Sequence, residues 1–281
     1  MNYLEVLNLG NDILKTKNIK TSSLDSELLL AKVLKLRRER LLINLDRQLS
    51  KKNLENFLKL IDRRQQKEPI AYIFKEKEFW KYNFIVNEHV LIPRPETEII
   101  VNEVLNLTNP NSSKRLLDVG TGSGCIILSI LKERPNCYGT AIDISKKALK
   151  VAISNAKMHH LRNKINFINI DIDKFNYNKY DFIISNPPYI NNYDLIRLDN
   201  NVRIYEPIVA LKAGIDGLSE IKKLINKSNA LLKKNGKLIF EIGEKHQHKI
   251  MKLLKKNGYY VNKICKDLNY KPRVFISTKI N

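Results

Sequence analysis

The stretch LLDVGTGSGCIILSIL, residues 116–131, decides the fold class. It begins as a hydrophobic strand that ends at Val119 and continues as an apolar helix after Gly124, with Asp118 and three glycines at or near the turn. In open α/β folds such a turn lies at the carboxyl edge of the sheet, where ligands bind. The glycines stand at 120, 122 and 124 and Cys125 follows them, so the dinucleotide fingerprint GxGxxG is not matched. The stretch therefore predicts a ligand-binding strand, loop and helix and argues against a nicotinamide dinucleotide.

The same alternation of strand and helix continues to the C-terminal region. Strands are predicted at 115–119, 138–142, 165–169, 180–185 and 236–242, and helices at 96–107 and near 124–133, 145–157, 218–234 and 245–256. Strands that alternate with helices imply right-handed crossovers and a mainly parallel sheet that is covered on both faces. The last two strands, 259–265 and 272–278, are joined by a segment too short for a crossover helix, which predicts an antiparallel pair.

The chain before this region changes character twice. Residues 1–68 show apolar residues at helical spacing with few glycines or prolines, which predicts a small helical bundle domain. Residues 69–95 alternate aromatic or β-branched residues with polar ones, which predicts a β-hairpin linker that Pro93 and Pro95 end. Residues 96–281 are then the α/β domain.

Composition sets further bounds. The chain has 281 residues, with 50 Lys+Arg against 29 Asp+Glu and a formal net charge of +21. Such a charge would suggest an anionic partner, but the lysines accompany Asn and Ile in every segment and form no Arg-rich block. We therefore favour a general compositional bias over a nucleic-acid surface. The three cysteines form no CxxC pair, which predicts reduced thiols in the cytoplasm. The N-terminus does not resemble a secretory signal, no apolar run reaches the roughly 18 residues that a membrane span needs, and the five His show no metal-binding spacing.

A second carboxylate ends the next predicted strand. Asp143 lies in YGTAIDISKKAL, residues 138–149, at about the distance at which an acidic residue meets a ribose in nucleotide-binding βαβ units. Its two oxygens can accept hydrogen bonds from both ribose hydroxyls. A loop that contains Asp118 also suits a sulfonium and an ammonium group better than it suits a pyrophosphate. The alternative is that the glycines only join strand to helix and Asp143 only caps the following helix, but both features on consecutive strands favour a cofactor site.

The fourth predicted strand runs into NPPY, residues 186–189. Pro187 and Pro188 have no N–H group, so this loop offers carbonyl oxygens as hydrogen-bond acceptors. Asn186 adds a side-chain carbonyl, and Tyr189 adds an aromatic face. The loop suits a planar NH₂ group, whose two N–H donors would meet two acceptors. A proline-rich turn that only ends a strand is the alternative, and the position beside the cofactor loop disfavours it.

Together these motifs resemble a known family. DVGTGSG at 118–124, Asp143 and NPPY resemble class I S-adenosylmethionine-dependent methyltransferases that act on a planar amino or amide nitrogen. One family is especially similar, the PrmC/HemK protein-(glutamine-N5) methyltransferases. The motifs that carry this likeness, besides the helical N-terminus and NPPY, are PRPETE at 93–98, VRIYEP at 202–207, LKAGIDGL at 211–218 and PRVFI at 272–276.

The resemblance implies a Rossmann-like fold and methyl transfer from S-adenosyl-L-methionine to the glutamine of the GGQ motif in class I peptide chain release factors. It also implies that the N-terminal bundle binds the release factor. Asn186 to Tyr189 would hold the substrate amide, with Asn186, Pro187 and Tyr189 as the catalytic residues. Asp143 would bind the ribose, and Asp171 with Ile172 would flank the adenine. The full set that the resemblance assigns to the cofactor is Asp118, Gly120, Thr121, Gly122, Ser123, Gly124, Asp143, Asp171, Ile172 and Asn186. Two positions depart from the family pattern: Lys75 stands where Gly is usual, and Ile172 replaces a frequent larger side chain.

Two other functions stay open on the sequence alone. NPPY is shared with adenine-N6 nucleic-acid methyltransferases, because the exocyclic amine of adenine presents the same planar pair of donors. Such an enzyme must flip the base and usually has a duplex-recognition domain, and residues 1–68 show no evident basic recognition helix, so direct binding of nucleic acid is disfavoured. The third hypothesis is a binding module for a release factor or the ribosome that has lost catalysis, which the presence of Asp118, Asp143 and Asn186 disfavours.

Overall fold

The structure, a computed structural model, describes residues 1–280 and divides into two compact units. One unit comprises Met1–Lys75 together with Asp199–Tyr205, and the other comprises the rest of the described chain. Each unit has its own hydrophobic core. Within residues 1–280, no helix has the length and apolar character that crossing a membrane requires.

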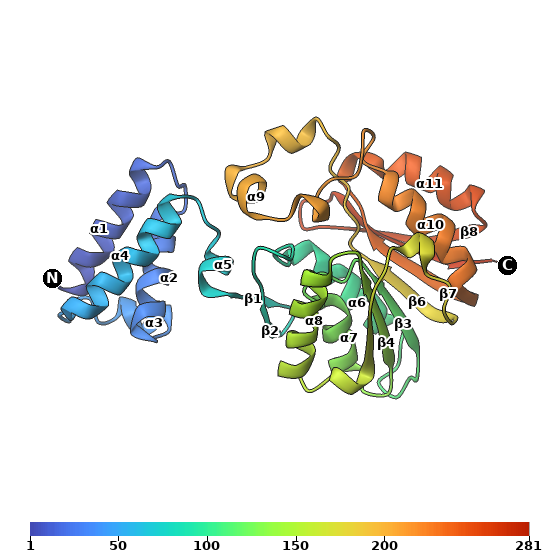
Figure 1. Cartoon of the computed structure of the whole chain (residues 1–281), viewed down its shortest axis with the longest axis horizontal. Helices are drawn as coiled ribbons and strands as arrows, with labels where there is room; N and C mark the ends of the chain where they lie inside the picture. The colour runs from blue at the N-terminus through green and yellow to red at the C-terminus, as the bar shows by residue number, and fades with distance from the viewer. Residues whose placement is uncertain (281) are drawn as a thin grey trace. The chain divides into compact units, whose positions relative to one another are not determined.

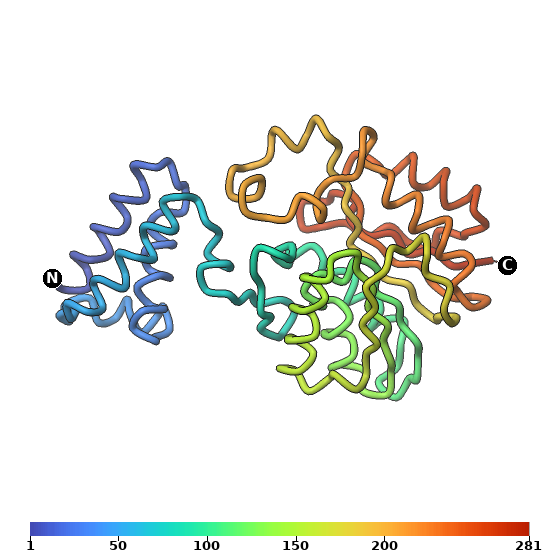
Figure 2. The backbone as a smooth tube through the Cα atoms, viewed as in Figure 1, coloured from blue at the N-terminus to red at the C-terminus, as the bar shows by residue number. Residues whose placement is uncertain are grey.

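The N-terminal unit is helical. Asn2 caps its first helix through a reciprocal capping box with Glu5, and Ser50 caps the helix that begins at Lys51. Figure 2 shows the three longest helices of this unit running beside one another, and they enclose a core that includes Leu14, Leu29 and Phe57. The helices are α1 (Tyr3–Thr16), α2 (Ser22–Leu34), α3 (Arg38–Leu42), α4 (Lys51–Gln65), α5 (Ile70–Phe74) and α9 (Asn200–Tyr205).

The α9 segment comes from much later in the chain. Asp199–Tyr205 belongs to the same compact unit as residues 1–75, and the Tyr205 hydroxyl donates a hydrogen bond to the Gln66 carbonyl oxygen over 2.9 Å. The sequence analysis places residues 199–205 within the domain 96–281 and does not predict their grouping with the N-terminal helices. A short polar segment between two predicted strands carries no pattern that indicates where it packs.

The linker contains a hairpin that is shorter than predicted. Strands β1 (Glu76–Phe79) and β2 (Tyr82–Ile85) form an antiparallel two-stranded sheet. The prediction of strand structure is wrong for Ile70–Phe74, which forms α5, because a short apolar run has no periodicity that separates a strand from a buried helical turn. Lys75 ends α5 with φ +59°, in the left-handed region that favours glycine. Lysine can adopt this conformation at a cost of about 1–2 kcal/mol, so the helix ends in a left-handed turn without a glycine.

The second unit is built on a seven-stranded sheet with the order β5-β4-β3-β6-β7-β9-β8. The first five strands in this order are parallel, and β9 is antiparallel to both β7 and β8. The mainly parallel sheet and the antiparallel C-terminal pair are therefore confirmed. The strands are β3 (Arg115–Val119), β4 (Tyr138–Asp143), β5 (Ile165–Asn169), β6 (Tyr180–Ser185), β7 (Leu232–Glu241), β8 (Tyr259–Lys266) and β9 (Pro272–Lys279).

Helices cover both faces of this sheet (Figure 1). Side chains alternate along β3, so that Leu116 packs into one core cluster with α6 (Glu98–Asn106), α7 (Cys125–Glu133) and α8 (Lys146–Met158). Leu117 packs into the other cluster with α10 (Ser219–Leu231) and α11 (Gln247–Lys256). Short 3₁₀ turns are η1 (Pro95–Thr97), η2 (Arg162–Lys164), η3 (Ile172–Lys174), η4 (Asp194–Arg197), η5 (Ile208–Ala210) and η6 (Glu244–His246).

The strand order places the ligand edge. The chain enters the sheet at β3, adds β4 and β5 on one side, and then returns to place β6 on the other side of β3. The carboxyl ends of β3 and β6 therefore form a topological switch point, where α/β folds bind ligands. Val119 and Ser185 are register partners there.

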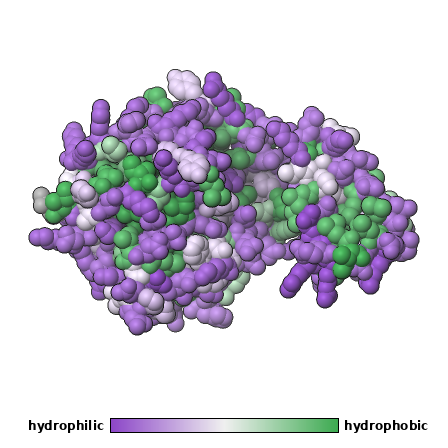
Figure 3. All heavy atoms as spheres, turned by 180° about the vertical axis from the view of Figure 1, so that it is seen from behind, coloured by the Kyte–Doolittle hydropathy of each residue, from purple (hydrophilic) through white to green (hydrophobic). Residues whose placement is uncertain are grey.

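The visible outer face of this unit is largely hydrophilic (Figure 3).

Candidate functional site

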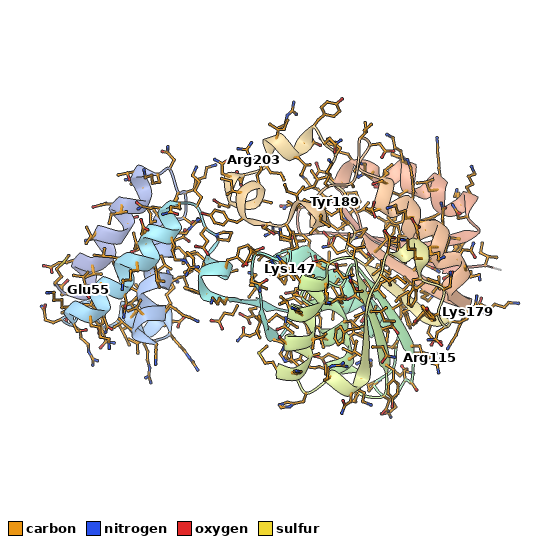
Figure 4. The ribbon with its side chains drawn as sticks, viewed as in Figure 1. Glu55, Arg115, Lys147, Lys179, Tyr189 and Arg203 are labelled. Atoms are coloured by element: carbon orange, nitrogen blue, oxygen red, sulfur yellow. The ribbon has the colours of Figure 1, made fainter. Side chains whose placement is uncertain are left out.

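A cleft of about 700 Å³ opens at this switch point, within the α/β unit. In Figure 4, Lys147 and Tyr189 lie toward this edge of the sheet, whereas Arg115 and Lys179 lie at the opposite edge. Most of the site residues predicted from the sequence line the cleft: Gly120, Thr121, Gly122, Ser123, Asp143, Asp171, Ile172, Asn186, Pro187 and Pro188. Asp118, Gly124 and Tyr189 are not among the lining residues.

The glycine loop needs its glycines for two different reasons. Gly120, Gly122 and Gly124 have φ of +70°, +55° and +80°, which side chains rarely tolerate. A Cβ added at Gly120 or Gly122 would meet nothing within 4 Å, because both residues border the open cleft. A Cβ added at Gly124 would lie 3.0 Å from Leu128 Cδ1 and 3.3 Å from Ala152 Cβ. The first two glycines therefore keep space for a ligand, whereas the third lets α7 approach α8.

This difference gives a prediction. Gly124→Ala is expected to destabilise the protein by about 1–3 kcal/mol through a strained left-handed conformation and crowding against Ala152. Gly122→Ala carries the strain alone, but its methyl group enters the cleft, so it is expected to weaken cofactor binding more than Gly124→Ala does. Thermal unfolding and calorimetric titration with S-adenosylmethionine measure the two effects. Equal losses of cofactor affinity in the two variants would contradict this division.

Asp118 lies beneath the loop and is fully buried. Its Oδ2 accepts a 2.7 Å hydrogen bond from the Thr121 hydroxyl, and its Oδ1 has no hydrogen-bond partner within residues 1–280. Burial raises the pKa of Asp118 to about 7. The carboxyl group thus supports the loop through Thr121. Its predicted contact with the cofactor stays a prediction.

Asp143 lies at the end of β4 and holds the glycine loop from the side. Its Oδ2 accepts a 3.0 Å hydrogen bond from the Gly122 N–H, and its Oδ1 accepts a 2.8 Å bond from the Ser145 N–H. The helix that follows is capped by Ser145, whose side chain accepts from Ala148 N. Burial raises the pKa of Asp143, although the two N–H donors act in the opposite direction. Each carboxylate oxygen retains a lone pair for a ligand hydroxyl, so the structural and ligand-binding roles are compatible.

Asp171 and Ile172 also line the cleft. Asp171 accepts a 2.9 Å hydrogen bond from Asp173 N at the start of η3, and Ile172 is buried against the core beside Leu224. An acceptor beside an aliphatic surface suits the edge and face of a planar base. The predicted adenine contacts of these two residues therefore have the chemistry they need, and they stay a prediction.

The NPPY loop follows β6 directly. Ser185 Oγ donates to the Val119 carbonyl oxygen over 2.7 Å, which fixes the start of this loop against the glycine loop. Asn186 Nδ2 donates to Thr97 Oγ1 over 3.1 Å. Among residues 1–280, no hydrogen-bond donor is found for Asn186 Oδ1 or for the Pro187 carbonyl oxygen. Asn186 and Pro187 both line the cleft, so binding of the substrate amide by their two acceptor oxygens stays a prediction with suitable chemistry.

Tyr189 lies in the NPPY loop and contacts the core of the α/β unit. Its hydroxyl donates to Glu241 Oε1 over 3.2 Å, and its ring packs against the core on the α10 and α11 side of the sheet. Burial raises the pKa of Tyr189, and the charge of Glu241 acts in the same direction. Because Tyr189 is not a lining residue, the proposed packing of its ring on the substrate amide stays a prediction.

Sequence reasoning assigned no role to Thr97, Glu241, Arg94 or Glu206. Thr97 Oγ1 donates to Glu241 Oε2 over 2.6 Å, so both residues belong to the hydrogen-bond network around Asn186. Arg94 lines the cleft and forms a 2.5 Å ion pair with the buried Glu206. The sequence does contain a signal for Glu241. It is an acidic residue near the end of the apolar strand GKLIFEI, residues 236–242, and a carboxylate there lies at the ligand edge of the sheet.

The site residues fit S-adenosylmethionine. Open space above Gly120 and Gly122, a carboxylate at Asp143 and an aliphatic pocket at Ile172 match its aminoacyl, ribose and adenine parts in kind. Within residues 1–280, no group of three or more His, Cys, Asp or Glu side chains is arranged to hold a metal ion.

The chain matches two family models. The model described as the PrmC N-terminal domain matches residues 5–74, and the model described as the methyltransferase small domain matches residues 97–202.

Curated relatives match over nearly the whole chain. A release factor glutamine methyltransferase of Caulobacter vibrioides is 35% identical, with 96% of this chain and 94% of the relative covered. One of Clostridium acetobutylicum is 33% identical, with 99% of each chain covered. A bifunctional methyltransferase of Rickettsia felis is 36% identical over 99% of this chain, which spans only 58% of that relative's length. The chain is thus similar to a little more than half of the larger protein.

Solved structures support the fold alone. A methyltransferase from Pyrococcus furiosus aligns with a TM-score of 0.53 at 19% identity, covering 70% of this chain and 89% of that one. A tRNA m1G37 methyltransferase from M. jannaschii aligns with a TM-score of 0.51 at 19% identity, covering 73% of this chain and 56% of that one.

Proposed function

Because the chain belongs to the family of release factor glutamine methyltransferases, we propose that it methylates the side-chain amide nitrogen of the glutamine in the GGQ motif of class I peptide chain release factors. S-adenosyl-L-methionine is the cofactor and supplies an electrophilic methyl group on a sulfonium. The observation that carries the proposal is that Asn186 and Pro187 line the same cleft as Asp143 and the glycine loop. Since a release factor acts in translation, the proposed reaction belongs in the cytoplasm.

The chemical problem is the weak nucleophilicity of an amide nitrogen. Its lone pair is delocalised into the carbonyl group, and its pKa is too high for a side-chain base to remove a proton first. Asn186 Oδ1 and the Pro187 carbonyl would accept the two amide N–H bonds, increase the charge on nitrogen and orient its lone pair. Positioning of this kind can lower a barrier by up to about 7–11 kcal/mol, and preorganised acceptors stabilise the positive charge that develops on nitrogen. The proton can leave after attack, so no general base is needed.

The test is mass spectrometry of a purified class I release factor after incubation with this protein and S-adenosylmethionine. We expect one added methyl group on the GGQ glutamine and none on a factor whose glutamine is replaced by alanine. Adenine-containing DNA is assayed in parallel at low salt, because phosphate-dependent binding would be strongest under that condition. The DNA is expected to remain unmodified. Methylated DNA beside an unmodified release factor would contradict the proposal and favour an adenine methyltransferase.

We further propose that residues 1–68 bind the release factor, that 69–95 link the two parts and that 96–281 carry out methyl transfer. A variant that starts at Pro69 is expected to raise KM for the intact release factor by at least tenfold. It is expected to retain cofactor binding and activity on a short GGQ peptide, because every residue that lines the cleft lies in the α/β unit. Steady-state kinetics on the two substrates separate recognition from chemistry. An unchanged KM for the intact factor would assign the N-terminal helices another role.

A further inference from the structure

Asn186 is the end of a buried chain of hydrogen bonds. Asn186 Nδ2 lies 3.1 Å from Thr97 Oγ1, and Thr97 Oγ1 lies 2.6 Å from Glu241 Oε2. The other oxygen of Glu241 accepts from the Tyr189 hydroxyl over 3.2 Å. Thr97 and Glu241 are 2% and 1% exposed, so water does not compete for these bonds. Four side chains from three separate parts of the chain thus share one network.

The network has a defined direction. Burial raises the pKa of Glu241 to about 7, so at pH 8 most of the Glu241 carboxylate is ionised. An ionised carboxylate only accepts hydrogen bonds, and 2.6 Å is the length typical of an O–H donor to such a group. The single proton of the Thr97 hydroxyl is therefore committed to Glu241. The Thr97 oxygen must then receive its other hydrogen bond from a donor, and Asn186 can supply one only through Nδ2.

The direction of the network decides which atom of Asn186 faces the cleft. A rotated Asn186 amide would place Oδ1 against the Thr97 oxygen, which has no proton left to donate. Burial of such an unpaired acceptor costs free energy. The observed orientation instead pairs Nδ2 with Thr97 and leaves Oδ1 to accept from a substrate, and Asn186 and Pro187 both line the cleft.

We propose, on the basis of the proposed function above, that Thr97 and Glu241 are positioning residues that hold the Asn186 amide with Oδ1 toward the substrate and thereby select a glutamine amide over a glutamate carboxylate. Glutamine and glutamate have the same shape, so space in the cleft cannot distinguish them. Two acceptors attract an NH₂ group and repel an oxygen anion. With Asn186 rotated, Nδ2 would instead donate to a carboxylate oxygen, and the discrimination would fall.

Two substitutions change the direction of the network without removing volume. Thr97→Val removes the hydroxyl, so nothing opposes rotation of Asn186. Glu241→Gln can place an NH₂ group against Thr97, which frees the Thr97 proton to donate to Asn186 Oδ1 and favours the rotated amide. Thr97→Ser keeps the hydroxyl and serves as the conservative variant. Thr140→Val is the matched control, since Thr140 is also buried and accepts a side-chain hydrogen bond, from the Tyr180 hydroxyl, but does not line the cleft.

The experiment measures two quantities at pH 8 for the full-length protein. One is kcat for methylation of a release factor, and the other is inhibition by the same factor with its GGQ glutamine replaced by glutamate. For Thr97→Val and Glu241→Gln we expect kcat to fall at least tenfold and the glutamate factor to inhibit at least tenfold more tightly relative to wild type. Thr97→Ser and Thr140→Val are expected to match wild type in both quantities.

The inference would be overturned if Glu241→Gln and Thr97→Val kept the wild-type discrimination between glutamine and glutamate. It would also be overturned if Thr97→Ser behaved like Thr97→Val, because packing rather than the hydroxyl would then be responsible. Calorimetric binding of S-adenosylmethionine to each variant reports whether the α/β unit is folded. Failure of the wild-type protein to methylate any release factor would overturn the proposed function instead, so the two failures are distinguishable.

Discussion

Asn186→Ala is expected to reduce kcat for release factor methylation by about 10²–10³-fold, the loss that follows removal of one preorganised polar group from an active site. Asn186 lines the cleft, and its substitution removes both the Oδ1 acceptor and the Nδ2 donor to Thr97. Without this acceptor, one amide N–H of the substrate has no partner, and the nitrogen lone pair is no longer oriented. Single-turnover assays with saturating cofactor measure the effect directly.

A matched control is available on the same sheet. Asn166→Ala, at an exposed position near the opposite edge, is expected to leave kcat unchanged. Thermal unfolding of the Asn186 variant shows whether the α/β unit remains folded. A kcat within threefold of wild type for Asn186→Ala would remove this residue from the proposed mechanism and leave only the Pro187 carbonyl as an acceptor.

Asp143→Ala is expected to weaken S-adenosylmethionine binding by about 10²-fold, since hydrogen bonds to a charged group contribute about 1.5–3 kcal/mol each. The loss has two sources. The ribose hydroxyls would lose their acceptor, and the Gly122 and Ser145 N–H groups would lose the partner that holds the glycine loop. Asp143→Asn keeps one acceptor oxygen and is expected to lie between alanine and wild type. Isothermal titration calorimetry measures all three.

The control for this series is Asp173→Ala. Asp173 is an exposed carboxylate that does not line the cleft, so its removal changes net charge by the same amount without removing a ligand contact. Equal affinities of the Asp143→Ala and Asp173→Ala variants would show that the cofactor responds to charge alone and would reject the ribose assignment.

The parts of the site that could be predicted from sequence are those encoded locally. The glycine loop, Asp143 and NPPY each follow an apolar strand within a few residues, and the carboxyl ends of parallel strands meet at one edge of a sheet. Thr97 and Glu241 could not be paired in this way. They are 144 residues apart and meet only because η1 packs over the end of β7. No periodicity in the sequence reports such a contact.

The errors have physical reasons of the same kind. The five residues Ile70–Phe74 bury Tyr72 and Ile73 as a single helical turn, and an apolar run of that length suits a strand equally well. The grouping of Asp199–Tyr205 with the N-terminal helices is a further feature that the sequence does not reveal, because it depends on contacts between residues far apart in the chain. The sheet, by contrast, was predictable because five apolar strands alternate with three amphipathic helices in a recurring pattern.

The N-terminal unit is assembled from two stretches of chain that the ribosome makes at different times. Helices α1 to α5 are complete once Lys75 has been made, but Asp199 follows only after another 124 residues (199 − 75). At about 5–20 residues per second, this interval lasts roughly 6–25 s. During that time the early helices can fold while the Gln66 carbonyl still lacks the Tyr205 hydroxyl that it accepts from in the finished protein. Strands β3 to β6 are synthesised in the same interval, so a nascent chain that ends near Leu198 is expected to hold a folded helical bundle with an incomplete contact set. Synthesis of Pro207 to Ala210, which also line the cleft, follows directly after the segment that completes the bundle.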